Sequence, residues 1–294
     1  MNTSLSKWKL LASAVLVAWS TSLGAENPPG ATGPESKDEQ VIVPKETIHL
    51  FDGRTLTNFY TWLVDFKRSD PACVYSVVDA IDGGPAIRIS GQYFGGLTTK
   101  SGYANYHLIA ECRWGLLTWA ERKSAAKDSG ILVHGQGEDG SYFSKDFNGP
   151  WMRSYEFQII EGGMGDILVL AAYDLKGNVV KAHLTAPVIK DRDGEPVWDA
   201  AGTPTTFDGG RVNWCGRDPD WVDQLGFRGK QDVESPHGEW TRLEIFCKGD
   251  SLKYLVNGKV VNQASACSLT SGRILLQSEG AEIFFRRVDL EPLP

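Results

Sequence analysis

Residues 243–261 read LEIFCKGDSLKYLVNGKVV, in which the dipeptide Asn257-Gly258 joins the apolar run Leu252–Val256 to Lys259–Val261. Before them Leu243, Ile245 and Cys247 occupy every second position, which predicts a half-buried antiparallel strand. A type I′ turn needs positive φ at both central residues, and Asn-Gly tolerates this best. The stretch therefore predicts a two-residue β-hairpin.

The same period of two recurs in residues 86–90 and 106–114. Turn dipeptides such as Asp52-Gly53, Asp139-Gly140 and Gly177-Asn178 separate the apolar runs. Many short strands with such turns are typical of a sandwich. We expect an all-β fold, a jelly-roll β-sandwich of two antiparallel sheets. The best candidate for a helix is a short one over Trp119–Lys127, ended by Asp128-Ser129-Gly130.

Residues 186–237 lack this period of two and contain five prolines, many glycines and three tryptophans. A loop this long inside a compact domain is unusual and often functional. We expect an elaborated loop over one end or face of the sandwich. The alternative is a solvated insertion that only packs its own tryptophans.

The N-terminus has the pattern of an export signal. Lys7 and Lys9 precede the apolar run Leu10–Leu23, and Gly24-Ala25 offers a cleavage site. We predict a signal peptide over 1–25, a flexible linker over 26–46 and one β-sandwich domain over 47–294. The mature protein would then be periplasmic or secreted, without stable membrane insertion. The alternative is an uncleaved anchor, although the apolar run is short for a span.

Net charge and cysteine spacing exclude several classes of protein function. The net charge is −7 and no Lys/Arg cluster occurs, so nucleic acid is excluded as a partner. The five cysteines contain no CxxC pair, which excludes a zinc ribbon or a dithiol redox motif. Their odd number leaves at least one thiol unpaired within the monomer. Cys112 and Cys247 fall within strand patterns and are interpreted as small core residues.

Candidate site residues follow from which side chains share a strand face. In residues 154–161, Tyr155, Phe157 and Ile159 share one face, and their apolar rings and chains belong in the core. Glu156 and Gln158 then point to the other face. A solvated strand face is the ordinary alternative for these two residues.

The same reasoning applies to residues 130–134. Ile131 and Val133 would face the core, so His134 turns outward with Leu132. If the strands are neighbours in a curved sheet, His134 meets Glu156 on its concave side. Residues of another strand can join them there: Arg273, Leu275 and Gln277.

A curved sheet with imidazole, carboxylate, amide and guanidinium groups, rimmed by tryptophan, suits a carbohydrate. Hydroxyls need paired donors and acceptors, and sugar rings stack on aromatic side chains. His134 can act as a general base near neutral pH. The alternative for His134 is a strand-end histidine whose ring is bonded to a backbone carbonyl.

A glycine-rich turn, Glu161-Gly162-Gly163-Met164-Gly165-Asp166, follows this strand. It lacks the strand-to-helix context of a phosphate-binding loop, so nucleotide binding is excluded. Glu161 and Asp166 are possible ligands of a divalent metal, although two carboxylates do not make a site. No other cofactor is predicted.

Several stretches in fixed order resemble the 3-keto-disaccharide hydrolase domain family. They are Leu50-Phe51-Asp52-Gly53-Arg54, Tyr106-His107-Leu108, Asp128-Ser129-Gly130-Ile131-Leu132-Val133-His134, Tyr155–Glu161 with Gly165-Asp166, Gly238-Glu239-Trp240, Val256-Asn257-Gly258 and Leu276–Glu282. The resemblance extends from about Ile48 to Leu293. It implies a concanavalin A-like lectin/glucanase fold.

The resemblance also implies activity on 3-keto-glycosides. A ketone at C3 acidifies the C2 hydrogen, so a base can remove that proton and the enolate can expel the C1 substituent. Water added later makes the net reaction a hydrolysis, and otherwise the enzyme is a lyase. This chemistry needs a base, a group that stabilises the enolate and a proton donor.

The roles that follow are assigned to residues of this chain. His134 is the expected base, and Glu156 is the second expected catalytic residue, as acid or ligand. The expected substrate-binding residues are Gln158, Arg153, Trp151, Gln277, Glu279 and Trp214. A non-catalytic carbohydrate-binding module of the same fold is the alternative, and a structural or adhesion domain is a weaker one.

Overall fold

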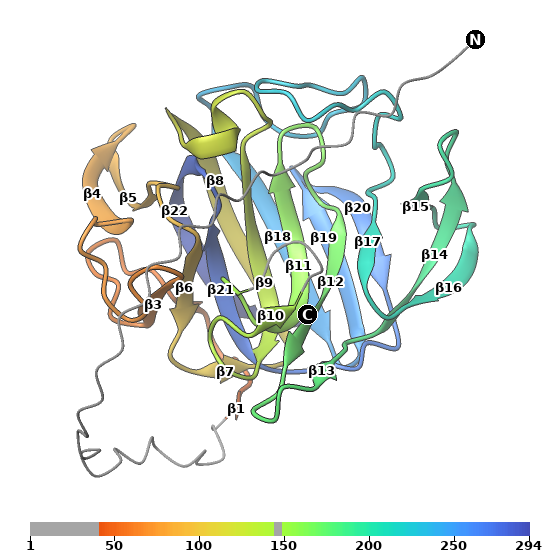
Figure 1. Ribbon diagram of the computed structural model, residues 1–294, viewed down its shortest axis with the longest axis horizontal. Helices are drawn as coiled ribbons and strands as arrows, with labels where there is room; N and C mark the ends of the chain where they lie inside the picture. Colours follow the sequence, from red (N-terminus) through yellow and green to blue (C-terminus); the bar gives the residue numbers. More distant parts are fainter. Residues whose placement is uncertain (1–40, 144–148) are drawn as a thin grey trace, which may run out of the picture. The chain divides into compact units, whose positions relative to one another are not determined.

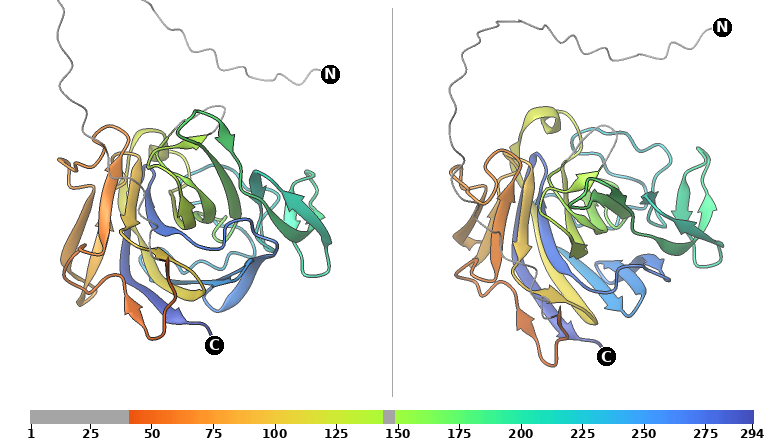
Figure 2. Two further views of the ribbon diagram at one scale, coloured as in Figure 1. Left: turned by 90° about the horizontal axis from the view of Figure 1, so that it is seen from below. Right: turned by 60° about the horizontal axis from the view of Figure 1, so that its bottom comes forward.

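The computed structural model describes residues 41–143 and 149–294. Its two large sheets lie face to face, as Figures 1 and 2 show, with the apolar core between them. Every pairing within these sheets is antiparallel. The predicted all-β jelly-roll sandwich is confirmed.

The nine-stranded sheet has the order β10-β12-β11-β9-β21-β6-β3, with β13 and β17 also paired to β12. Its strands are β3 (Phe59–Leu63), β6 (Gly95–Thr99), β9 (Asp128–Gln136), β10 (Tyr142–Phe143), β11 (Arg153–Ile160), β12 (Ile167–Tyr173), β13 (Val179–Val180), β17 (Gly210–Val212) and β21 (Arg273–Ser278).

The eight-stranded sheet has the order β20-β19-β18-β8-β22-β5-β4, with β2 paired to β22. Its strands are β2 (Ile48–His49), β4 (Tyr75–Ile81), β5 (Gly84–Ile89), β8 (Tyr106–Thr118), β18 (Thr241–Lys248), β19 (Ser251–Val256), β20 (Lys259–Ala264) and β22 (Ala281–Pro292). Two small sheets complete the fold: β1 (Val41–Ile42) parallel to β7 (Gly102–Tyr103), and β15 (Pro196–Trp198), β14 (Leu184–Lys190) and β16 (Thr203–Phe207).

The period of two in the sequence sets which side chains form the core. Leu243, Ile245 and Cys247 of β18 are fully buried, as predicted. Cys112 and Cys247 belong to the core, and burial raises the pKa of both thiols. All five cysteines lie in the described part of the chain, and none of them forms a disulfide.

The predicted hairpin at Asn257-Gly258 is confirmed. Val256 of β19 pairs with Lys259 of β20, so two residues form the loop. Asn257 has φ +48° and Gly258 has φ +77°, the left-handed values that a type I′ turn requires.

The predicted helix over Trp119–Lys127 is wrong in extent. Only η1 (Ala120–Lys123), a single 3₁₀ turn, forms there. Asp128 does not end a helix but begins β9, paired with Ile160 of β11. The backbone carbonyl of Lys127 accepts from the amide of Glu161 at 3.1 Å, so its backbone is bonded across to the neighbouring strand and not within a helix.

The first part of the expected loop over 186–237 is not structureless. It forms β15, β16, β17 and most of β14, and β17 adds a strand to the nine-stranded sheet. Pro187 of β14 lies opposite Pro204 of β16, and Pro196 is the first residue of β15. Residues 213–240 carry no strand and pack against the turn 161–166 through contacts described below.

Ordered structure begins earlier than the predicted domain boundary. Val41 and Ile42, in the predicted linker, pair with Gly102 and Tyr103. The predicted signal peptide and the linker up to residue 40 lie outside the described residues. Within the described ranges, no helix has the length and apolar character needed to cross a membrane.

Substitution of Gly258 by Ala should lower the free energy of unfolding by about 1 kcal/mol, because alanine is strained at φ +77°. Urea denaturation monitored by tryptophan fluorescence measures the effect. Gly84→Ala is the matched control, because Gly84 lacks a left-handed φ and nothing lies within 4 Å of its Cβ position. Equal effects of the two substitutions would contradict the turn assignment.

Candidate functional site

The outer face of the nine-stranded sheet, which points away from the core, carries a group of polar side chains. Tyr155, Phe157 and Ile159 of β11 lie in the core, as predicted from their spacing. Glu156 and Gln158 therefore point to the outer face. Both are only 2% exposed, so they are not the solvated residues of an ordinary strand surface.

Strand register places an arginine in line with Glu156. Glu156 is paired with Leu132 of β9 on one side and with Leu168 of β12 on the other. Leu168 in turn pairs with Arg211 of β17. Directly paired residues share a face, so Glu156 and Arg211 flank Leu168 on the outer face, with Cα atoms about 10 Å apart across two strand spacings.

A glycine provides the space in which two of these polar groups meet. Gly130 of β9 pairs with Gln158. A Cβ atom at position 130 would lie 2.3 Å from Oε1 of Gln277 and 2.6 Å from Oε1 of Glu156. Any side chain at this position would displace both groups, so the convergence of Glu156 and Gln277 depends on this glycine.

Glu156 is a strongly perturbed carboxyl of this face. Among the described residues no ion pair involves its side chain, and the amide of Gln277 lies beside it. Burial raises the pKa of Glu156 to about 8, and the charge of Asp128 adds to the rise, whereas Arg211 opposes it. Such a desolvated carboxyl is typical of acid–base chemistry.

Asp128 lies next to Glu156 and is fully bonded. Its Oδ2 accepts from Nη2 of Arg122 at 2.6 Å, and its Oδ1 accepts from Nε2 of Gln158. Burial raises the pKa of Asp128 to about 6, and the positive charges of Arg122 and Arg211 oppose the rise. The two carboxyls therefore differ in surroundings, which separates their protonation states near neutral pH.

Two further polar residues come from the end of β21. Both amide atoms of Gln277 are buried, and neither makes a hydrogen bond to a described residue. Burial raises the pKa of Glu279 well above its ordinary value, and the charges of Asp128 and Glu156 add to the rise. Gln277 and Leu275 occupy the outer face as predicted. Arg273 was expected to join them, and its Nη1 donates to the hydroxyl of Tyr60.

The turn 161–166 holds arginines and backbone amides. The buried Asp166 accepts from Nη1 of Arg211 at 3.2 Å, from Nη1 of Arg217 at 3.1 Å and from the amide of Trp214 at 2.8 Å. Burial raises the pKa of Asp166, and the two arginines oppose the rise. Because these two guanidinium groups already occupy the carboxylate and repel a cation, Asp166 does not fit the metal site considered for Glu161 and Asp166.

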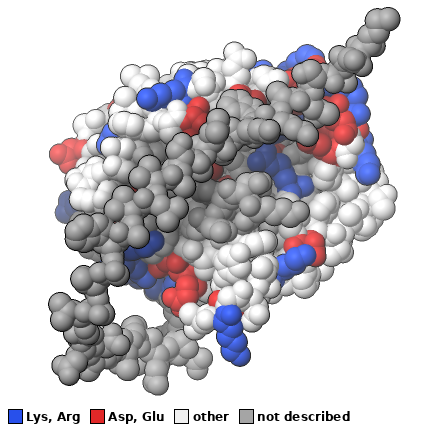
Figure 3. All heavy atoms as spheres, in the orientation of Figure 1, with Lys and Arg blue, Asp and Glu red and all other residues white. Residues whose placement is uncertain are grey.

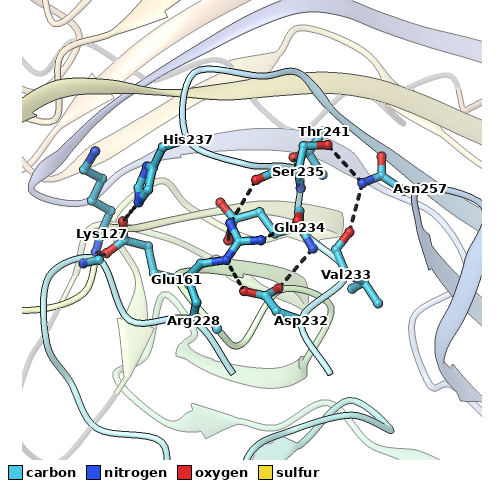
Figure 4. A network of polar contacts seen from close by, with 12 residues as sticks. Lys127, Glu161, Arg228, Asp232, Val233, Glu234, Ser235, His237, Thr241 and Asn257 are labelled. Carbon is cyan, nitrogen blue, oxygen red and sulfur yellow. Dashed lines mark hydrogen bonds and ion pairs between the residues drawn. The ribbon is translucent and has the colours of Figure 1, made fainter. Parts of the chain in front are cut away.

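Glu161 anchors the loop to the sheet. Its Oε2 accepts from the amides of Lys127 at 3.0 Å and Gly226 at 2.7 Å, and its Oε1 lies 3.4 Å from Nε2 of His237. Figure 4 shows Glu161 and His237 pointing toward one another. Among the residues that the structure describes, no group of three or more His, Cys, Asp or Glu side chains is arranged to hold a metal ion.

The prediction that His134 shares the face of Leu132 and Glu156 is wrong. A β-bulge lies between Val133 and Gln136, and His134 takes φ +55° in it, so the alternation of faces is broken. The ring packs in the interior against Tyr106, and Nδ1 lies 2.9 Å from the carbonyl oxygen of Leu269. Burial lowers the pKa of His134 to about 4.

The remaining expected binding residues fall in three places. Trp151 belongs to an apolar cluster on the outer face with Leu132, Met152, Leu170 and Leu275. Arg153 donates from Nη2 to Oε1 of Gln136 at 2.8 Å. Trp214 lies in the core and not on the outer face.

Sequence reasoning missed Asp128, Arg122 and Arg211. Asp128 was interpreted as the end of a helix, although its position two residues before Gly130 places it on the outer face of β9. Arg211 was assigned to a loop, because the three-residue strand β17 is too short to show a period. No pattern in the sequence indicates that Arg211 lies beside Glu156.

Comparison with known proteins now identifies the family. Residues 46–291 match the model of the 3-keto-alpha-glucoside-1,2-lyase-like domain. The chain belongs to this family. The match spans almost the whole described part of the chain, including every residue of the outer-face group. The resemblance noted from the sequence is therefore confirmed. Comparison with curated protein sequences gives no match.

Several solved structures are similar to this chain at low sequence identity. A glycosyl hydrolase-type protein from Parabacteroides distasonis is 16% identical, with a TM-score of 0.45, over 85% of this chain and 95% of the other. A β-glucanase from Bacillus licheniformis is 9% identical, with a TM-score of 0.39, over 84% and 98%. A carbohydrate-binding module from Bacillus subtilis is 10% identical, with a TM-score of 0.38, over 74% and 91%.

Substitution of Asp166 by Ala should lower the free energy of unfolding by about 3–5 kcal/mol, because it leaves the buried Arg217 without its carboxylate. Urea denaturation measures the change. Asp208→Ala is the control, because Asp208 forms only an exposed ion pair with Lys181 and its loss should have no measurable effect. A stable Asp166→Ala variant would contradict the anchoring role.

Proposed function

We propose that this protein is a carbohydrate-active enzyme that cleaves 3-keto-glycosides by removal of the C2 proton and β-elimination of the C1 substituent. The observation that carries the proposal is Glu156, a buried carboxyl with a raised pKa and no ionic partner on the outer face. The family supports the substrate class, since its model is named for a 3-keto-alpha-glucoside lyase.

The reaction begins at Glu156. Its ionised carboxylate removes the C2 proton, and the electron pair moves onto the C3 carbonyl oxygen to give an enolate. The enolate then re-forms the ketone as the C1–O bond breaks, which leaves a C1–C2 double bond. Glu156 returns its proton to the departing oxygen. Water added across the double bond makes the net reaction a hydrolysis, and release without water makes it a lyase reaction.

Gln277 is the proposed donor to the enolate. Its amide meets Glu156 above Gly130 and has no hydrogen bond among the described residues. A buried donor without a partner is free to bind charge that develops in the reaction. Asp128 and Gln158, which are bonded to each other, are the proposed partners of sugar hydroxyls, because a carboxylate or amide oxygen can accept more than one hydrogen bond.

The base is assigned to Glu156 in place of His134. With a pKa of about 4, His134 is neutral at physiological pH, and its ring is enclosed by the core. A general base must come within hydrogen-bond reach of the proton that it removes. A substrate on the outer face is separated from this imidazole by the sheet itself.

A non-catalytic carbohydrate-binding module is the second candidate, favoured by the apolar cluster around Trp151 on the same face. Such a module needs aromatic rings and amides alone. Burial of a carboxyl without a partner is costly, and a binding module gains nothing from that cost. Glu156 therefore favours the enzyme.

We also propose that the protein acts in the periplasm or outside the cell. The support is the run of Lys7, Lys9 and Leu10–Leu23, which has the pattern of an export signal. A carbohydrate is the proposed small-molecule partner, and the acidic net charge of −7 argues against nucleic acid.

Glu156→Gln should lower kcat by at least about 100-fold, since an amide cannot accept the C2 proton. The assay is release of the C1 substituent from a 3-keto-glucoside. His134→Asn is the control: asparagine tolerates the left-handed backbone, so this variant should fold and keep turnover within about threefold of the original protein. Full activity of the Glu156→Gln variant would remove Glu156 from the reaction.

The rate should depend on pH in the direction set by Glu156. Because the base must be ionised, kcat/KM should rise about tenfold per pH unit below 8 and level off above about pH 8. Steady-state assays from pH 5.5 to 9.5 measure the profile, within the range over which fluorescence shows a folded protein. A rate that falls between pH 6 and 8 would instead require a protonated Glu156.

A further inference from the structure

A cavity of about 480 Å³ lies on the outer face of the eight-stranded sheet, on the opposite side of the sandwich from Glu156. Residues of β18, β19, β20 and β14 line it, together with the chain that follows β22. Its volume falls in the range of small-molecule sites, about 300–1,000 Å³. The proposed reaction does not use this cavity, because the core and both sheets separate it from the outer-face group.

Strand register brings three polar or aromatic side chains into one row at the cavity. Leu252 and Tyr254 of β19 lie in the core, so Lys253 between them points outward. Lys253 pairs with Phe246 of β18 on one side and with Gln263 of β20 on the other. Directly paired residues share a face, so all three side chains point outward, and all three line the cavity.

The ammonium group of Lys253 is held in place by the ring of Phe246. It lies 4.4 Å from the ring centroid, which is the distance of a cation–π contact. On the side of β8, the same ring stacks on His107, with the centroids 3.9 Å apart and the planes at 11°. Because its neighbours on both sides cover the ring, Phe246 positions a charge here and offers no free face for a sugar.

The positive charge of the cavity is not balanced by a carboxylate. Lys248 of β18 is exposed and also lines the cavity. Among the described residues, lysine forms ion pairs at Lys181 and Lys230, and not at Lys248 or Lys253. The described residues that line the cavity include no Asp or Glu. The cavity therefore presents two ammonium groups that can bind an anion.

The carboxylates on the neighbouring strands are already paired. Glu244 accepts from Arg242 at 3.1 Å, and Glu291 accepts from Arg287 at 3.1 Å. The visible face in Figure 3 also carries acidic and basic side chains close to one another in several places. In a protein with a net charge of −7, a cavity with basic side chains alone is an exception that favours an anionic ligand.

The remaining lining of the cavity is largely apolar. It includes Pro187 of β14, Leu252 of β19, Ala264 of β20 and Leu293 after β22. Carbon surfaces of this kind gain free energy when they are covered by apolar atoms, and they offer no partner to a hydroxyl group. The ligand that fits has one negative group and an apolar body.

We propose that this cavity is a binding site for a small organic carboxylate with an apolar body, such as an aromatic acid. The carboxylate accepts hydrogen bonds from the ammonium groups of Lys248 and Lys253, and the apolar body covers Leu252 and Ala264. The amide of Gln263 can add a third donor. The inference does not rest on the proposed function.

The test is calorimetric titration of the full chain with benzoate, compared with benzamide, glucuronate and sulfate. Benzoate should bind at least about tenfold more tightly than each of the other three. Benzamide has the same shape without the charge, glucuronate has the carboxylate on a hydroxylated body, and sulfate has charge without an apolar body. Equal binding of benzamide would contradict the ionic contact, and equal binding of glucuronate or sulfate would contradict the apolar one.

Two double variants place the ligand in the cavity. Lys248→Gln, Lys253→Gln should weaken benzoate binding at least about tenfold, and it should fold because neither lysine forms an ion pair. Lys100→Gln, Lys176→Gln changes the net charge equally at two exposed lysines, and it should keep the affinity within about twofold. Equal affinities of the two double variants for benzoate would overturn the proposal.

A third variant separates this site from the outer-face group. Glu156→Gln should bind benzoate as tightly as the original protein, because Glu156 lies on the other side of the sandwich. If Glu156→Gln changes the affinity and the lysine variant does not, benzoate binds at the outer-face group and the inference fails. The titration needs no turnover, so failure of the proposed function would leave this result unchanged.

Discussion

The buried carboxylate of Asp166 is the contact on which the outer face depends. It binds two guanidinium groups and the amide of Trp214, and so joins β12, β17 and the start of the segment 213–240. Burial of three charges is costly unless their geometry satisfies all of them. The pairing of β17 with β12 sets the face of the sheet on which Arg211 lies, and Asp166 holds its guanidinium there, where its charge opposes the rise in the pKa of Glu156.

A second constraint is the absence of a side chain at Gly130. The register of β9 against β11 and β21 would otherwise place a Cβ atom where Glu156 and Gln277 meet. Since these two groups come from different strands, no local preference brings them together. The meeting of Glu156 and Gln277 therefore depends on the register of β9, β11 and β21 and on a residue of β9 that has no side chain.

Sequence reasoning predicted the faces of β11 and β18 correctly, because regular pairing preserves a period of two over their whole length. It failed at His134, because one extra residue in a bulge reverses the face, and alternation carries no sign of the bulge. It also failed at Arg211, whose position is set by a pairing with β12 more than forty residues earlier in the sequence. The chemical groups of the site could be predicted from residue type. The sheet face of each residue could be predicted only where strand pairing is regular.

The prolines of the small sheet have a consequence for the protein at high concentration. β15 and β16 form the two edges of that sheet, and each carries a proline at its first or second position, Pro196 and Pro204. A proline offers no amide hydrogen to an incoming strand, so neither edge presents a complete row of donors. A projecting β-sheet of this kind would otherwise be a template for aggregation, and the sequence keeps it from recruiting further chains.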